Sequence, residues 1–211
     1  MSLTKLLPPF LAEMALLIVY YTIPKHTLPA MLLFYLFVIF WFRKLLGGAE
    51  LRRSLADLRG FWLPTALASL GLAAAAGLKT LLSRLLSGVT SEGVTAVWTE
   101  NDVPGMLLYA LVTILLAPVA QELFFRGAMI RTGKKERSFM ILDALVGMIL
   151  CAALQVHSPL GVLEMMLIQL PCVIVYMRTR NIYIPVTVNF LWCLSQNLMY
   201  VVYSLARISF S

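Results

Sequence analysis

The chain has 211 residues, of which 61% are hydrophobic and only 13% are charged. Soluble globular domains contain about 45–50% apolar and about 25% charged residues, so this composition excludes an ordinary soluble enzyme or binding domain. The three cysteines lie singly in apolar runs, without CxxC spacing or a histidine cluster, and indicate neither a disulfide nor a metal site. A net charge of +7 by itself would suggest nucleic acid as a partner, but the positions of the basic residues, described below, indicate another reason for it.

Long apolar runs recur along the whole chain and are separated by short polar segments. A transmembrane helix needs about 20 mostly apolar residues. No A-x-A cleavage pattern follows the first run, which carries Glu13, so we expect an anchor and not a signal peptide. The sequence therefore predicts an all-α polytopic bundle of about seven transmembrane helices, at 6–24, 27–42, 61–78, 105–130, 139–156, 159–177 and 182–206.

Two connecting segments carry patterns of their own. Segment 43–60 spaces leucines among arginines and is typical of an amphipathic helix on the membrane surface. Segment 79–104 is the longest predicted loop, with the amphipathic stretch KTLLSRLLSG followed by acidic residues around Trp98. Tryptophan anchors both protein interfaces and membrane interfaces, so Trp98 could alternatively mark the lipid headgroup level. We expect Trp98, Glu100 and Asp102 to contact a partner protein.

The 17 Lys and Arg residues are distributed unevenly between the two sides of the predicted bundle. Only Lys25, Lys79, Arg84 and Arg207 fall on one side, and all the others fall on the opposite side. Because basic residues concentrate in cytoplasmic loops, this asymmetry predicts a multi-pass protein of the plasma or inner membrane. Its N-terminus would be cytoplasmic, and its C-terminus and the 79–104 loop extracytoplasmic. The positive charge then reflects topology, and no nucleic-acid partner is expected.

Polar residues at membrane depth are the candidates for function, because each is costly there unless paired or used. Glu122 and Arg126 are four residues apart in an apolar run, so they can form an ion pair on one helix face. Gln121 is adjacent to them in sequence. His157 ends the next predicted helix, and Asn189 lies in the last one. Further amides and an acid in these runs receive no specific role: Gln155, Glu164, Gln169, Gln196 and Asn197.

Three motifs in the second half of the chain resemble those of the CPBP (CAAX-processing and bacteriocin-processing, or Abi) family of intramembrane proteases. APVAQELFFRG resembles the family's proline-preceded Glu-Glu-x-x-x-Arg motif, and His157 stands where the family has Phe-x-x-x-His. YMRTRNIYIPVTVNFLWC resembles a Tyr-x-Arg-Thr-Gly-x-Ile-x-x-Pro run that leads into a His-x-x-x-Asn motif. The resemblance covers about 105–200 and implies a CPBP/Abi-like four-helix core in residues 105–211. Residues 1–104 would form an N-terminal unit of transmembrane helices, amphipathic segment and outer loop.

The residues to which the resemblance assigns chemistry are mostly replaced. It implies that the first glutamate of the pair activates the attacking water together with the second-motif histidine. That glutamate is Gln121 here, and an amide cannot act as a general base. Glu122 and Arg126 keep their family positions. Asn189 replaces the third-motif histidine, and Cys193 replaces the asparagine implied to stabilise the oxyanion, for which a thiol is a weaker donor.

Three hypotheses follow from these replacements. In the first, the protein is a catalytically silent member that binds another integral membrane or membrane-associated protein. In the second, it is an active endopeptidase with an altered residue set, in which Glu122 serves as the base with His157. In the third, it is a small transporter or immunity protein. The family-equivalent catalytic positions are Gln121, Glu122, His157, Asn189 and Cys193, and neither a metal nor another cofactor is expected.

Overall fold

The computed structural model describes residues 3–85, 102–131, 139–153, 155–156 and 158–209. In this part of the chain every element is a helix, which confirms the predicted all-α polytopic bundle. The elements are α1 Leu3–Thr22, η1 Pro24–His26, α2 Thr27–Trp41, η2 Arg43–Leu45, α3 Gly48–Ala56, η3 Leu58–Trp62, α4 Leu63–Leu85, α5 Val103–Ala110, η4 Leu111–Leu116, α6 Ala117–Gln121, η5 Glu122–Ala128, α7 Met140–Ala153, α8 Pro159–Thr179 and α9 Tyr183–Ser209.

Five helical stretches of the described residues are long and apolar enough to cross a membrane. They are Thr4–Thr22, Pro24–Trp41, Leu58–Leu82, Val103–Ala128 and Pro159–Thr179. The sixth apolar helix, α7, is shorter, with 14 residues. The seventh predicted helix corresponds to α9, which has 27 residues but is less apolar than these five. The chain is thus a multi-pass membrane protein.

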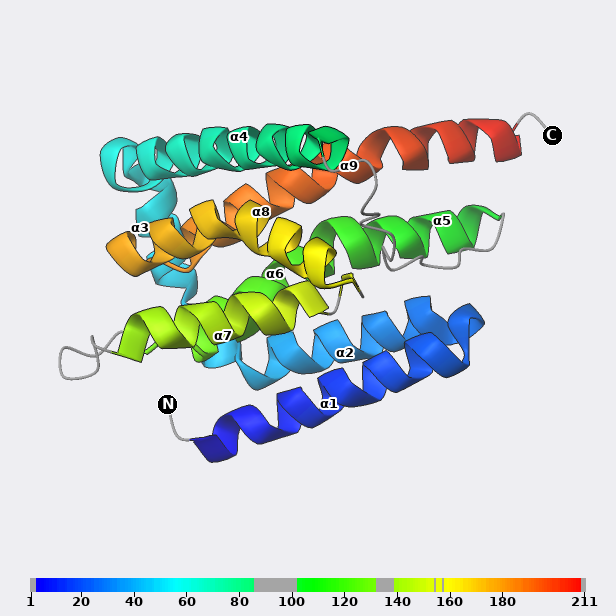
Figure 1. Cartoon of the computed structure of the whole chain (residues 1–211), viewed down its shortest axis with the longest axis horizontal. Helices are drawn as coiled ribbons and strands as arrows, with labels where there is room; N and C mark the ends of the chain where they lie inside the picture. The colour runs from blue at the N-terminus through cyan, green and yellow to red at the C-terminus, as the bar shows by residue number, and fades with distance from the viewer. Residues whose placement is uncertain (1–2, 86–101, 132–138, 154, 157, 210–211) are drawn as a thin grey trace.

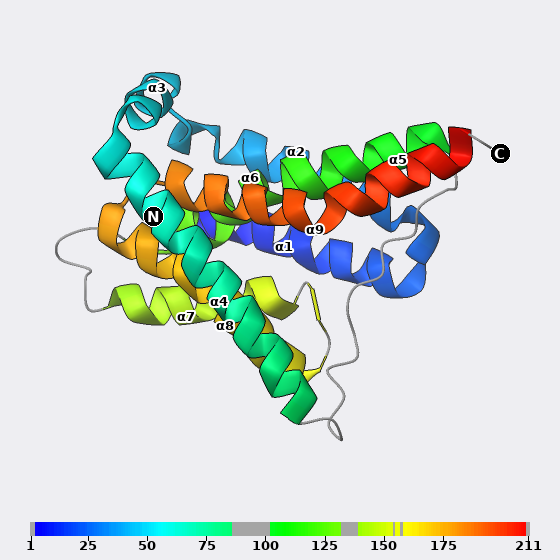
Figure 2. The ribbon, with the colours of Figure 1, turned by 90° about the horizontal axis from the view of Figure 1, so that it is seen from above.

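The continuous helix from α5 to η5 lies in the middle of the bundle. It packs against α2 on one side and α9 on the other, and α7 packs against its end. Helices α4 and α8 cross each other with an extensive contact, and α1 lies at the opposite edge of the bundle beside α2 (Figures 1 and 2). The start of α1 and the end of α9 lie at opposite ends of the bundle (Figure 1).

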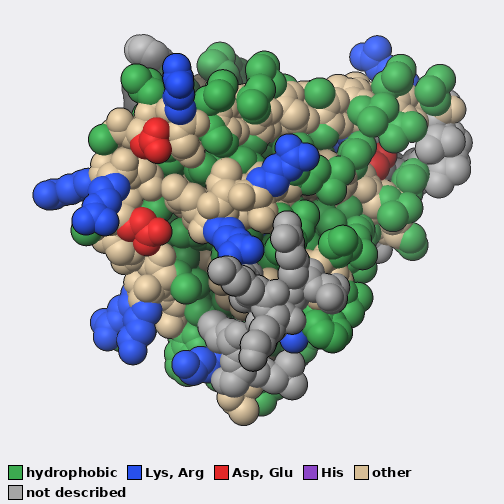
Figure 3. Space-filling view, turned by 90° about the vertical axis from the view of Figure 1, so that its left-hand side faces the viewer, with side chains coloured by type: hydrophobic (Ala, Val, Ile, Leu, Met, Phe, Trp, Pro, Cys, Tyr) green, Lys and Arg blue, Asp and Glu red, His purple; other side chains and the backbone are tan. Residues whose placement is uncertain are grey.

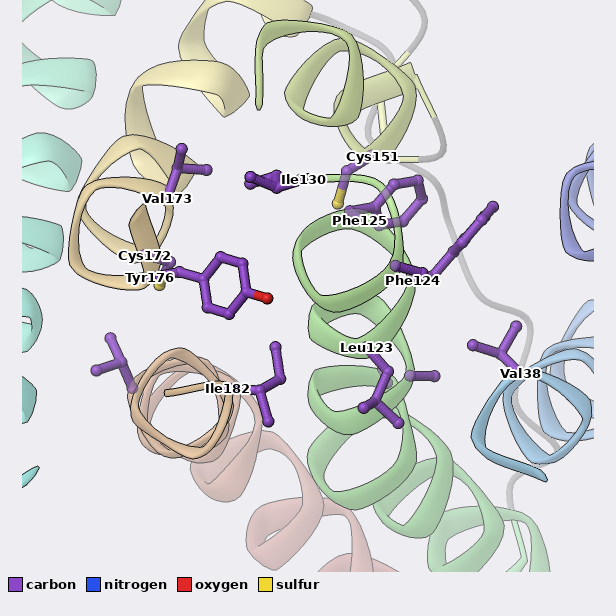
Figure 4. Close-up of a cluster of buried hydrophobic side chains, with 14 of the residues drawn as sticks. Val38, Leu123, Phe124, Phe125, Ile130, Cys151, Cys172, Val173, Tyr176 and Ile182 are labelled. Atoms are coloured by element: carbon purple, nitrogen blue, oxygen red, sulfur yellow. The ribbon is translucent and has the colours of Figure 1, made fainter. Parts of the chain in front are cut away.

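The central helix contains two wider, π-helical turns, η4 and η5, on either side of Pro118. Proline has no backbone N–H, and π turns inside α-helices are frequent at functional sites. Most of the η5 turn is buried, and Leu123, Phe124 and Phe125 are almost fully so. Figure 4 shows Leu123 and Phe124 on this helix, with Tyr176 pointing toward it from α8. The polar residues of η5, Glu122 and Arg126, are likewise buried.

Helix α4 extends further than the sequence predicted. It ends at Leu85, so most of the stretch KTLLSRLLSG continues the membrane helix and does not belong to a loop that begins at 79. Its leucines, lysine, and arginine favour helix, and neither glycine nor proline interrupts the chain between Lys79 and Leu85.

The amphipathic segment 43–60 forms η2, α3 and the start of η3 at one end of the bundle. Helix α3 is fastened to the turn between α8 and α9, because Asn181 Nδ2 donates to Ser54 Oγ at 2.8 Å. The Tyr183 hydroxyl also donates to the Gly47 carbonyl at 2.8 Å. Figure 3 views the end of the bundle where α3 lies, and Lys and Arg side chains gather there. That this end faces the cytoplasm remains a prediction.

Candidate functional site

A cavity of about 450 Å³ lies inside the bundle, between α1, α2, α4, the central helix, α7, α8 and α9. Its wall is apolar over most of its area but contains a concentration of polar groups that is unusual at membrane depth. The polar residues that line it include Tyr35, Lys79, Tyr109, Gln121, Glu122, Arg126, Gln155, Gln169, Asn189, Gln196 and Asn197. Intramembrane polar residues of this kind mark functional sites by default.

An enclosed ion pair forms the inner wall of this cavity. Glu122 and Arg126 lie one turn apart on η5, and Glu122 Oε1 is 3.2 Å from Arg126 Nη1. The two residues are 0% and 2% exposed. Removing two such charges from water is favourable only when further hydrogen bonds complete their shells.

Arg126 finds those further contacts on two neighbouring helices. Its Nη2 donates to Gln169 Oε1 of α8 at 3.1 Å, and its Nη1 lies 3.9 Å from Cys151 Sγ of α7. One guanidinium thereby joins η5 to both α7 and α8. Sequence reasoning assigned Gln169 no role. The only available signal was an amide in an apolar run, which does not identify its partner.

Asn189 provides the link from the central helix to α9. Its Nδ2 donates to Glu122 Oε1 at 2.9 Å and approaches Gln121 Oε1 at 3.5 Å. Cys193, one turn further along α9, lies with its Sγ 3.6 Å from Asn189 Oδ1. The structure therefore brings four of the five family-equivalent positions together. The fifth, His157, lies outside the described residues.

The chemistry of this arrangement differs from that of an acid–base site. The side chain at the general-base position is the amide of Gln121, which has no basic lone pair. The neighbouring carboxylate of Glu122 is enclosed, and a guanidinium and an amide already contact its Oε1. Its Oε2 has no hydrogen-bond partner within the described part of the chain. These contacts hold the side chains of Glu122 and Asn189 in a fixed arrangement.

A second polar network lines the cavity further along α9. The Tyr109 hydroxyl donates to Asn197 Oδ1 at 2.7 Å, and Asn197 Nδ2 donates to the Cys193 carbonyl at 2.8 Å. Lys79 Nζ of α4 lies 3.8 Å from Glu164 Oε2 of α8. Sequence reasoning missed Tyr109 and Lys79, because their distance in sequence from α8 and α9 gives no signal of proximity.

Of the three residues predicted to bind a partner, the structure describes only Asp102. Trp98 and Glu100 lie outside the described residues. Asp102 is the N-cap of α5, where its Oδ1 accepts a hydrogen bond from the Gly105 backbone N–H at 2.8 Å. A cap of this kind satisfies a helix-terminal donor, so Asp102 has a structural role whether or not a partner touches it.

Among the described residues, no group of three or more His, Cys, Asp or Glu side chains could hold a metal ion. Divalent zinc in proteins takes three or four such ligands at short distance. The polar lining of the described part of the cavity consists mainly of amides and hydroxyls, which suit hydrogen bonding to a peptide or another neutral polar group.

Comparison with known proteins agrees with the sequence motifs. Residues 103–195 match the model of the family described as type II CAAX prenyl endopeptidase Rce1-like. The matched span contains Gln121, Glu122, Arg126, Asn189 and Cys193, and thus the residues that surround the inner part of the cavity. No curated protein and no solved structure matches the chain. Residues 103–195 are thus similar to this family of CAAX endopeptidases, which supports the resemblance to the CPBP/Abi family.

Proposed function

We propose that this protein is a catalytically silent member of its family. The observation that supports this most directly is the pairing at the general-base position. Gln121 supplies an amide there, and the enclosed carboxylate of Glu122 is engaged with Arg126 and Asn189. A base must have a lone pair free to take a proton from the water it activates. Gln121 has no basic lone pair, and the Oε1 of Glu122 is already engaged with Arg126 and Asn189.

The replaced residues are expected to lower the rate of hydrolysis by several orders of magnitude. Loss of a general base typically costs about 10²–10⁴-fold in rate. Loss of an oxyanion donor, here the replacement of an amide by the Cys193 thiol, costs about 10²–10³-fold. Together these losses cancel much of the acceleration expected of an intramembrane protease.

The retained cavity then serves binding. Its amides and hydroxyls can accept and donate hydrogen bonds to the backbone of an unwound peptide segment, and its apolar surface suits flanking hydrophobic side chains. We propose that the protein holds or positions a membrane-embedded segment of another membrane protein. The bilayer and that protein are its partners.

An active endopeptidase is the second candidate, and one observation favours it. Glu122 lines the cavity, and its buried Oε2 has no hydrogen-bond partner among the described residues, so this oxygen could accept a hydrogen bond from a water molecule held there. His157 would then act as its partner. The two candidates give opposite results in a direct assay.

The assay uses the intact protein in lipid nanodiscs with fluorogenic prenylated and transmembrane peptides. We expect no turnover by the unmodified protein. Restoring the family residues with Gln121→Glu, Asn189→His and Cys193→Asn together is the minimum change expected to produce any. Turnover by the unmodified protein that disappears in His157→Ala would overturn the proposal.

Partner binding needs its own experiment, because inactivity alone does not establish a binding role. The protein is purified from its native membrane, and co-purifying proteins are identified by mass spectrometry. The proposed contact at the outer loop 79–104 is tested with two variants, Trp98→Ala and Glu100→Lys. Asp102 is left intact because it caps α5. Loss of the partner from a variant that still folds supports an interface at this loop. Retention of the partner places recognition elsewhere, inside the membrane.

A further inference from the structure

Three acidic residues are buried in the described part of the bundle, and two of them face a basic residue of the same chain. Glu122 faces Arg126 at 3.2 Å, and Glu164 faces Lys79 at 3.8 Å. The third, Glu13 of α1, is 1% exposed, and its enclosed Oε2 has no hydrogen-bond partner among the described residues. An acid at membrane depth is costly unless it is paired or functional, so Glu13 needs an explanation.

Glu13 lies on the inward face of α1, half-way along the helix. It stands ten residues after the first residue of α1, which is about 15 Å along the helix and half of a hydrocarbon core of about 30 Å. The inward stripe of α1 runs Leu6, Phe10, Glu13, Leu17 and Tyr20, at alternating spacings of four and three. Glu13 is the only charged residue in this stripe.

Two hollows meet the stripe on either side of Glu13. Leu17 and Tyr20 line the 450 Å³ polar cavity described above. Leu6 and Phe10 line a separate hollow of about 310 Å³, whose other walls come from η5 and α7. Thr4 alone breaks the apolar lining of this second hollow. Glu13 itself lines neither hollow. It lies one turn beyond Phe10 on the stripe, so a long apolar side-chain stem in the second hollow would have to pass Phe10 to place its polar end at Glu13.

Helix α1 is also the least embedded of the helices that form these hollows. It lies at the edge of the bundle and packs chiefly against α2 (Figure 1). The Trp41 Nε1–H donates to the Lys5 carbonyl at 3.0 Å and fastens the start of α1 to the end of α2. Because few other elements hold α1, a partner helix could approach the second hollow along the side of α1 that faces α7.

We propose that Glu13 is the recognition site for a lysine or arginine carried at mid-depth by a membrane-spanning segment of a partner protein. The inference rests on the proposed function and names the feature by which the partner is selected. The methylenes of the basic side chain would fill the apolar hollow, as such stems commonly cover apolar surface, and the charged end would pair with Glu13. Charge complementarity selects this occupant over an uncharged lipid chain.

The test uses synthetic 21-residue transmembrane peptides of leucine and alanine that carry a single central Lys, Leu or Glu. Each peptide carries a fluorophore, and its Kd for the intact protein is measured by energy transfer in zwitterionic nanodiscs. We expect the central-Lys peptide to bind at least about tenfold more tightly than the central-Leu peptide, and the central-Glu peptide to bind most weakly. In Glu13→Gln, the preference for lysine should disappear.

The matched control is Glu50→Gln, which makes the same chemical change at an exposed position on α3 and should leave the preference intact. Equal binding of the Lys and Leu peptides by the unmodified protein would overturn the inference without any variant. So would a lysine preference that survives in a folded Glu13→Gln protein. Cleavage of a peptide would instead overturn the proposed silent function, so the two failures are distinguishable.

Discussion

The network around Arg126 allows one prediction to be developed from distances. The guanidinium contacts Glu122 Oε1 at 3.2 Å and Gln169 Oε1 at 3.1 Å, and Arg126 is 2% exposed. Arg126→Met keeps a long side chain but leaves the buried carboxylate without its cation. Breaking a buried ion pair from one side typically costs about 3–5 kcal/mol. We therefore expect the free energy of unfolding to fall by about that amount.

A thermal melt of the purified protein in detergent provides the assay. For a chain of this size about 1 kcal/mol shifts the Tm by about 2–4 °C, so Arg126→Met should melt roughly 6–20 °C lower. Arg178→Met removes the same charge at an exposed position and should change stability by no more than about 0.5 kcal/mol. If Arg126→Met melts like Arg178→Met, the pair is not energetically buried and the reasoning about the cavity wall fails.

The double variant Glu122→Gln with Arg126→Met extends this test. Removing both charges relieves the unpaired carboxylate, so the double variant should be more stable than Arg126→Met alone. A double variant whose loss equals the sum of the two single losses would show that the two residues are not coupled.

Two further predictions concern the backbone. Arg180 ends α8 in the left-handed conformation, with φ 55°, at the position where the family motif has glycine. Glycine adopts this conformation without strain, so Arg180→Gly should raise the free energy of unfolding by up to about 1 kcal/mol. A lower melting temperature would contradict this. A Cβ at Gly147 of α7 would lie 2.8 Å from the Phe125 carbonyl oxygen, so Gly147→Ala should lower the free energy of unfolding by about 1–3 kcal/mol. The control is Gly48→Ala, whose Cβ would meet nothing within 4 Å and which should be nearly neutral. Equal melting temperatures of the two variants would refute the close contact.

Hydropathy was sufficient to predict the helices. A backbone segment in lipid must satisfy its own hydrogen bonds, so a long apolar run in a membrane protein forms a helix. The predicted helix 105–130 corresponds to a continuous helical stretch from Val103 to Ala128. The end of α4 was misplaced because lysine and arginine break the apolar run without breaking the helix. The two π-helical turns of the central helix, on either side of Pro118, were not predicted from the sequence.

The site was predictable only where its members are close in sequence or belong to a known motif. The spacing of Glu122 and Arg126 suggested a pair because residues four apart share a helix face. Asn189, 67 residues from Glu122, entered through the family resemblance and not through any local pattern. Gln169 had neither source of information, and its contact with Arg126 spans 43 residues. Long-range polar contacts of this kind are fixed by helix packing.

The polar network remains to be explained if it no longer supports catalysis. Well-packed apolar residues in place of a buried ion pair are often neutral or even stabilising, so stability alone does not require Glu122, Arg126 and their amide partners. What the network provides is a defined geometry, because Arg126 links three helices and Asn189 adds a fourth. Replacing it with apolar side chains would fill or collapse the cavity that these helices surround. Under the proposed function, the groups needed for hydrolysis have been replaced, while the shape and polarity of a binding cavity are retained. The network is what we expect in that case, and it supports the proposed binding function.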